Sequence, residues 1–171
     1  MGLGILICRK PIENTIIEGG TGSSSLEFLQ PDILPEMLES GTGNMPAIAG
    51  LSAGLDFVNN IGITQIYNKE MRLLKMLYEG LLKCPKIVLY TEPPLVHKYA
   101  PLMPFNVKGI RSDDASAYFD KNGIALRAGL HCAPTAHKVL NTADSGVLRA
   151  SFSVFNNQEE VKRVINVAKN I

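Results

Sequence analysis

The chain after Pro85 alternates short apolar runs with amphipathic stretches, and this alternation limits the folds it can adopt. The four runs expected to form strands are residues 86–90, 102–107, 124–127 and 147–152. A helix with its cap at Ser112 is expected to run to about Lys121, and another from Asn157 towards the C-terminus. This order predicts an α+β domain with helices on one face of a small sheet.

Two longer helices are predicted upstream of this domain. The first begins at Pro46 and ends before Gly62, and the second runs from Ile63 to about Leu82. The second carries an apolar stripe at helical spacing, which indicates a buried core face. Its members are Ile66, Met71, Leu74, Leu77 and Leu81.

The N-terminal part contains one continuous apolar run and one glycine-rich segment. Residues 3–8 are predicted to form a strand buried on both faces, with sheet partners outside this chain. Residues 18–25 are expected to be a loop, either a flexible linker or a loop that contacts a cofactor or a second subunit. The division expected is 1–45 for a remnant of a large α/β domain, 46–84 for connecting helices and 85–171 for the C-terminal domain.

Composition excludes several classes of function. A net charge of +1 over 171 residues, without a basic run, does not indicate binding to nucleic acid or to anionic membranes. Three widely spaced cysteines argue against a disulfide framework or a metal site and fit a reducing cytoplasm. A spanning helix needs about 20 consecutive apolar residues, and no stretch approaches that length.

Candidate chemistry is concentrated between Arg127 and His137, in the sequence RAGLHCAPTAH. Cys132 follows a predicted strand and lies beside His131, and a thiolate favoured by such neighbours can attack an electrophile or carry sulfur. The alternative is a buried structural cysteine. Arg149, inside the last predicted strand, is either half of an internal salt bridge or a clamp for a carboxylate.

Several segments, in their order along the chain, resemble the C-terminal part of the fold-type I, class V enzymes that use pyridoxal 5'-phosphate. Their sequences are most similar to those of cysteine desulfurases and selenocysteine lyases with an Arg-x-Gly-x-His-Cys-Ala turn. The segments are Gly2–Leu6, Glu18–Gly22, Ser40–Asn44, Arg127–Ala133 and the strand around Arg149.

The resemblance implies a role for each candidate residue. Cys132 matches the cysteine that becomes a persulfide as L-cysteine is converted to L-alanine, and Arg149 matches the arginine that binds the α-carboxylate of the substrate. Thr42 matches a threonine that reaches the cofactor phosphate of the neighbouring subunit in a homodimer, although Ser40–Asn44 could also be a plain turn. His131 would handle a proton or pack the loop, and Arg127 would support the turn.

In this family a lysine upstream of a Gly-x-Gly strand holds the cofactor as a Schiff base. That strand corresponds to the start of this chain, so we expect the lysine and the N-terminal half of the enzyme to be absent. The pairs His97-Lys98 and His137-Lys138 precede no such strand and are expected to be an exposed loop or a helix pair.

We therefore predict that the chain alone does not hold pyridoxal phosphate stably. The visible spectrum, recorded after adding the cofactor and dialysing, should show no retained cofactor band. A band that survives dialysis and disappears on replacing one lysine would contradict this expectation.

Three functions stay open from the sequence. The chain is part of a cysteine desulfurase that takes an amino acid as substrate and passes sulfur to an acceptor protein, or part of a class V aminotransferase acting on a small amino acid. The third alternative is a stand-alone remnant or interaction module without catalysis.

Overall fold

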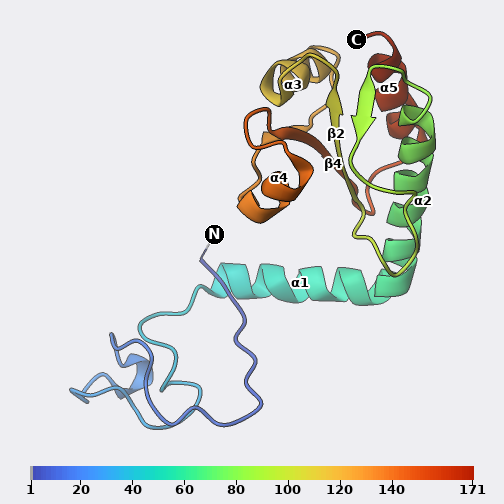
Figure 1. The fold of residues 1–171 in the computed structure, drawn as a ribbon. Helices are drawn as coiled ribbons and strands as arrows, with labels where there is room; N and C mark the ends of the chain where they lie inside the picture. Colours follow the sequence, from blue (N-terminus) through green and yellow to red (C-terminus); the bar gives the residue numbers. More distant parts are fainter. Residues whose placement is uncertain (1) are drawn as a thin grey trace. The chain divides into compact units, whose positions relative to one another are not determined.

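The computed structural model describes residues 2–171 and separates into two compact units, Met1–Asn60 and Ile61–Ile171 (Figure 1). The boundary falls one residue before the end of the first long helix, within the segment expected to connect the domains.

The C-terminal unit contains a four-stranded antiparallel sheet in the order β1-β2-β4-β3. Its strands are β1 (Ile87–Leu89), β2 (Leu102–Val107), β3 (Arg127–Gly129) and β4 (Val147–Ser151). The two longest strands, β2 and β4, lie side by side in the middle, with Met103 opposite Ala150 and Phe105 opposite Leu148. The chain thus has the mixed α+β architecture that the alternation of runs predicts.

The sheet has one apolar face, because side chains alternate between faces along a strand. Met103, Phe105, Leu148 and Ala150 are all buried and, as cross-strand partners, point to the same side. By the same alternation the intervening residues, Arg149 among them, point to the opposite side, here called the open face.

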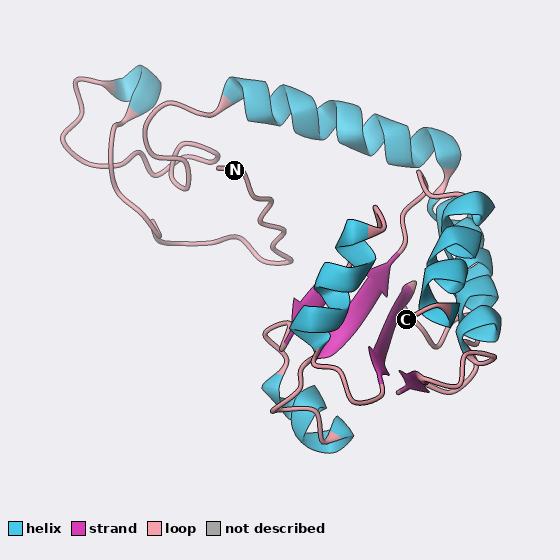
Figure 2. Ribbon diagram, turned by 90° about the horizontal axis from the view of Figure 1, so that it is seen from above, coloured by secondary structure: helices cyan, strands magenta, loops and turns pink. Residues whose placement is uncertain are grey.

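Three helices supply the rest of the core against the apolar face: α2 (Ile63–Leu81), α3 (Ser112–Lys121) and α5 (Gln158–Lys169). The predicted apolar stripe of α2 is largely confirmed, since Met71, Leu74, Leu77 and Leu81 are buried. Phe119 of α3 meets Phe105 edge to face, with ring centroids 6.0 Å apart. Figure 2 shows α3 and the α2–α5 pair beside the strands.

Local capping explains where α5 begins. The Asn157 side chain accepts a hydrogen bond from the Glu160 backbone N–H, and the Glu160 carboxylate accepts one from the Asn157 N–H. This capping box satisfies two helix-end donors at once. By contrast, the cap expected at Ser112 is wrong by one residue, because Arg111 holds the N-cap position and Ser112 starts the helix.

Two features of this unit differ from the sequence expectation. The strand predicted at 124–127 is shifted towards the C-terminus and begins at Arg127. A short helix, α4 (Pro134–Leu140), follows the Cys132 turn and was not predicted; its one sequence signal is Pro134 at the first helical turn. At seven residues it lacks the length for a readable apolar period.

The N-terminal unit has little regular structure: a 3₁₀ turn, η1 (Gly22–Ser24), and one long helix, α1 (Met45–Ile61). Residues 3–8, predicted to pair with strands outside this chain, form no strand in this structure. This segment forms no ladder, and its apolar side chains are exposed, Ile7 at 88%. A strand needs a partner for its backbone groups, and within the described residues this segment has none.

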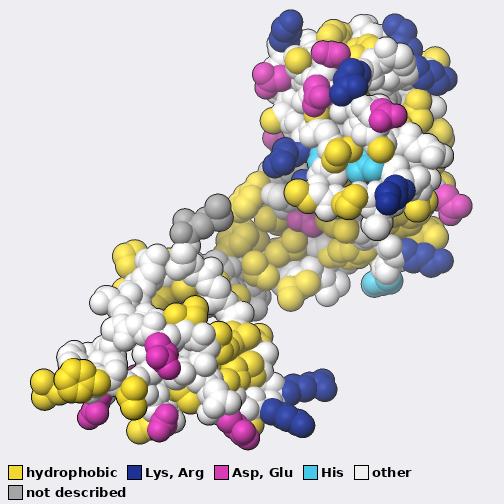
Figure 3. Space-filling view, turned by 60° about the vertical axis from the view of Figure 1, so that its left-hand side comes forward, with side chains coloured by type: hydrophobic (Ala, Val, Ile, Leu, Met, Phe, Trp, Pro, Cys, Tyr) yellow, Lys and Arg dark blue, Asp and Glu magenta, His cyan; other side chains and the backbone are white. Residues whose placement is uncertain are grey.

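Apolar side chains are widely exposed in this unit, as the yellow surface in Figure 3 shows. Phe28 is fully exposed, and α1 has no buried residue along its 17-residue length. Most of the stability of a helix in a protein comes from tertiary packing of its apolar face, and the apolar face of α1 buries no residue within the described part of the chain. Among residues 2–171, no helix combines the length and the apolarity required to cross a bilayer.

We expect limited proteolysis of the dilute chain to cut first between Ile16 and Pro46, because this stretch is exposed and carries few tertiary hydrogen bonds. Mass mapping of early fragments would locate the cuts. Equal resistance of this stretch and of the sheet-containing unit would contradict the prediction.

Candidate functional site

The turn that contains Cys132 has an unusual backbone. Ala133 donates its N–H to the Leu130 carbonyl at 2.9 Å, which closes a four-residue turn with His131 and Cys132 at its centre. Both central residues have positive φ, 50° and 55°. Turns of this kind normally require asparagine or glycine, and a left-handed residue with a Cβ costs about 1–2 kcal/mol. The sequence places two disfavoured residues here, as is typical of functional sites.

The ring of His131 fastens this turn to strand β4. Its Nε2 lies 3.0 Å from the carbonyl oxygen of Val147. A carbonyl only accepts, so Nε2 carries the hydrogen and, in the neutral ring, Nδ1 is an acceptor. That Nδ1 is buried and has no partner among the described residues.

A second histidine packs against the first. His137 of α4 is buried and stacks on His131, with ring centroids 6.4 Å apart and planes 25° apart. Its Nδ1 lies 2.8 Å from the Thr142 hydroxyl. His137-Lys138 is therefore a helix pair, as expected, but its histidine faces the interior.

Two arginines face each other across the sheet edge. Arg127 of β3 and Arg149 of β4 are direct cross-strand partners, so both side chains leave the same open face. The ion pairs among residues 2–171 involve neither arginine. The Nε of Arg149 is buried and also lacks a partner there. An internal salt bridge, the structural alternative for Arg149, is absent from this part of the chain.

Two buried side-chain nitrogens without a partner are thus found in residues 2–171, in His131 and Arg149. Both residues were singled out from the sequence, and β4 positions both, through the Val147 carbonyl and through Arg149 itself. Buried unpaired polar atoms are rare in folded proteins and call for an explanation in each case. Their location favours a site in this corner of the unit.

The cysteines differ in exposure in the order that a sulfur-handling turn requires. Cys132 and Cys8 are exposed, whereas Cys84 is buried at the end of α2 and donates to the Gly80 carbonyl. Within residues 2–171, no group of three or more His, Cys, Asp or Glu side chains could hold a metal ion.

Thr42 belongs to the other unit, in the loop before α1, and is exposed. Asn44 accepts a hydrogen bond from the Ala47 N–H at 3.2 Å and so acts as the cap of α1. Thr42 therefore lies just before the positive end of a helix dipole, where phosphate oxygens are favoured.

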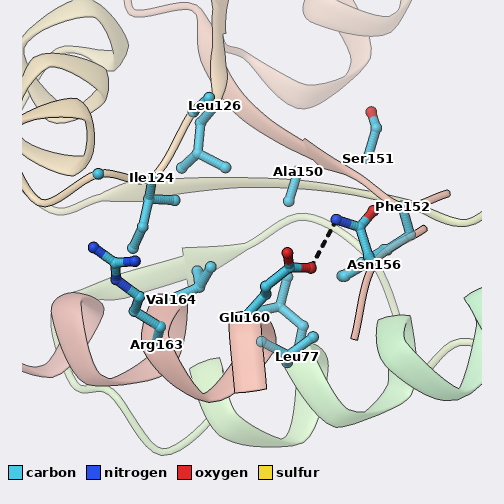
Figure 4. A pocket seen from close by; sticks show the side chains of 13 residues that line it. Leu77, Ile124, Leu126, Ala150, Ser151, Phe152, Asn156, Glu160, Arg163 and Val164 are labelled. Carbon is cyan, nitrogen blue, oxygen red and sulfur yellow. Dashed lines mark hydrogen bonds between the residues drawn. The ribbon is translucent and has the colours of Figure 1, made fainter. Parts of the chain in front are cut away.

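A cavity of about 300 Å³ lies elsewhere, between α5 and the segment 124–126 (Figure 4). None of the candidate residues lines it. Its floor is apolar, with Leu77, Ile124 and Val164, and Glu160 projects over it. Hydrogen bonds from the Asn156 side chain and the Asn157 N–H lower the pKa of Glu160 from its ordinary value, so this carboxylate already serves the helix cap.

Sequence reasoning missed two parts of this corner, His137 and the Val147 carbonyl. His137 was judged only as half of a His-Lys pair. A spacing signal existed, since His131 and His137 flank one short turn and helix, but backbone carbonyls carry no sequence signal.

Comparison with known proteins identifies the family of the chain. The family model for class-V aminotransferases matches residues 1–164. The chain belongs to the class-V aminotransferase family. Proteins of this family use pyridoxal 5'-phosphate; a C-DES variant solved with glycine covalently linked to that cofactor shares the fold, with a TM-score of 0.58 and 21% identity over 78% of this chain and 31% of that one.

Within the family, the similarity is to cysteine desulfurases. A probable cysteine desulfurase of Pyrococcus abyssi is 33% identical over 180 residues, which cover 99% of this chain and 43% of that protein. The apo cysteine desulfurase of Thermococcus onnurineus NA1 superposes with a TM-score of 0.72 and 36% identity, over 80% of this chain and 33% of that one. The chain thus spans less than half the length of these relatives.

Proposed function

We propose that this chain supplies the sulfur-accepting cysteine and the carboxylate-binding arginine of a cysteine desulfurase, which moves sulfur from L-cysteine to Cys132 and leaves L-alanine. The observation that carries the proposal is the corner of β3 and β4. An exposed thiol lies in a strained turn shortly after β3. On β3 and β4 two arginines face each other and form no ion pair in residues 2–171.

Arg149 is suited to hold the substrate. A planar guanidinium binds a carboxylate with two parallel hydrogen bonds, and such charge-assisted bonds are about twice as strong as neutral ones. Arg127, directly opposite, raises the positive potential of the same face. An anionic group relieves the repulsion between the two cations, which favours binding of the α-carboxylate here.

Cys132 is suited to take the sulfur. Pyridoxal phosphate, when bound, supplies the electron-withdrawing group that weakens bonds around the α-carbon of the amino acid. The Cys132 thiolate attacks the substrate sulfur: an Sγ–S bond forms, the Cβ–S bond breaks, and its electron pair stays with the carbon, which takes up a proton to give alanine. Exposure of Cys132 leaves the persulfide accessible to an acceptor protein.

Thr42 would contribute from the other unit. We assign its hydroxyl to the phosphate of a cofactor bound by the neighbouring subunit of a homodimer. Its exposed place before the α1 cap suits an anion.

The test uses a chimera in which residues 2–171 replace the matching part of the Pyrococcus abyssi desulfurase. After incubation with L-cysteine and cofactor, mass spectrometry should find a persulfide on Cys132, and alanine should accumulate. Cys132→Ser should abolish the persulfide, whereas Cys8→Ser, the matched change at another exposed cysteine, should not. A folded, cofactor-loaded chimera that releases a 2-oxo acid and leaves Cys132 unmodified would instead identify an aminotransferase.

A further inference from the structure

The structure assigns His131 as the positioning residue that keeps the Cys132 turn in its left-handed conformation against β4. This inference rests on the proposed function, in which Cys132 is the sulfur acceptor, and it adds the means by which the thiol is aimed. It starts from the conflict between the residues of the turn and its backbone.

The turn cannot be explained by local preference. His131 and Cys132 both have positive φ, and neither is glycine or asparagine. The one backbone hydrogen bond that closes the turn, from Ala133 to Leu130, is no compensation for two disfavoured residues in series. A conformation of this kind persists only where the surroundings impose it.

The ring of His131 supplies that constraint from both sides. On one side Nε2 donates to the Val147 carbonyl, on the strand that carries Arg149 two residues later. On the other side the ring stacks on His137, which is itself held by the Thr142 hydroxyl. The thiol-bearing residue is therefore coupled to the carboxylate clamp through one imidazole and one carbonyl.

The unpaired Nδ1 supports a positioning role for the ring. A histidine placed for its own stability would use both nitrogens, but here one is buried without a partner in residues 2–171. The arrangement therefore serves the geometry of the turn at a cost to the hydrogen bonding of the ring.

Amide hydrogen exchange on the chain tests the inference directly. In His131→Ala the Ala133 amide should exchange about tenfold faster, since the loss of one hydrogen bond and a ring stack is of that order. The Leu148 amide, which donates to Asn106 in the core, should stay as in the unchanged chain. His97→Ala is the matched control, because His97 is also left-handed but lies exposed on another loop.

Unchanged exchange at Ala133 in His131→Ala would overturn the inference. Should this variant unfold the unit, seen as equal acceleration at Leu148, Thr142→Val decides the question. This variant removes only the hydroxyl that contacts the His137 ring. Hydrogen exchange at the Ala133 amide should become about threefold faster, a smaller effect than the loss of a full hydrogen bond. No acceleration in Thr142→Val would then reject the role.

Kinetics in the chimera separate positioning from mere stability. His131→Ala should lower kcat for persulfide formation and leave KM for L-cysteine nearly unchanged, because Arg149 is untouched. A rise in KM alone would contradict the role. A chimera without desulfurase activity would contradict the proposed function. The hydrogen-exchange result on the chain would still decide whether His131 holds the turn.

Discussion

Gly146→Ala is expected to destabilise the C-terminal unit by more than about 3 kcal/mol, enough to unfold a marginal domain. Gly146 has φ +62°, and a Cβ there would lie 2.5 Å from Ser112 Oγ and 2.9 Å from the Gly129 Cα. The second contact is with backbone, so the start of β4 would have to move away from β3. Val147 would move with it, and its carbonyl would no longer be placed to accept the hydrogen bond from His131.

Gly109→Ala is the matched control for this prediction. Gly109 has a similar φ of +74°, but a Cβ there meets no atom within 4 Å. Its replacement should cost only the left-handed strain, about 1–2 kcal/mol. Urea unfolding of both variants would compare the two costs. Equal losses would show that the contact with Gly129 does not constrain the sheet edge.

Arg149→Met is expected to separate stability from activity. Arg149 has no ion pair in residues 2–171, a buried unpaired Nε, and a like charge directly opposite. Its removal should leave the free energy of unfolding unchanged or raise it, since it relieves both penalties. In the chimera, kcat/KM for L-cysteine should fall about 10²–10³-fold, because a bidentate charge-assisted pair is lost.

The opposite outcome for Arg149→Met would identify a structural arginine. If Arg149 were half of a buried salt bridge, its removal would lower the free energy of unfolding by about 3–5 kcal/mol. Thermal and urea unfolding of the chain alone measure this without any cofactor. Arg163→Met serves as control, because its side chain donates to the Asn122 carbonyl away from the open face.

Sequence patterns predicted the elements whose apolar spacing and end signals are local. The bounds of β2 agree with those predicted, and those of α3 and the two long helices agree within one residue at each end. The run Leu3–Cys8 differs in this respect: it can be a strand only when another strand pairs with it, and it is unpaired within residues 2–171. Helix α4 was too short for periodicity to show.

The candidate site could be predicted only in part from the sequence. Arg149 was notable as an arginine inside an apolar strand, whereas residue types alone left Cys132 open between a structural and a reactive cysteine, and the resemblance to a family favoured the reactive one. That Arg127 and Arg149 stand directly opposite depends on the register of β3 against β4, and register is not encoded in either strand taken alone. The left-handed turn at His131 and Cys132 contradicts the turn preferences of these residues, so preference rules could not have predicted it.

The placement of Val147 and Arg149 on one strand has a consequence for how the thiol-bearing turn and the carboxylate clamp are spaced. Two residues of a strand span about 7 Å, a length fixed by the backbone that no side-chain rotation can alter. The turn that carries the thiol is attached at one end of this interval and the carboxylate clamp projects from the other. In the proposed function, the strand therefore sets the separation between the point where the thiol-bearing turn is attached and the point from which the carboxylate clamp projects.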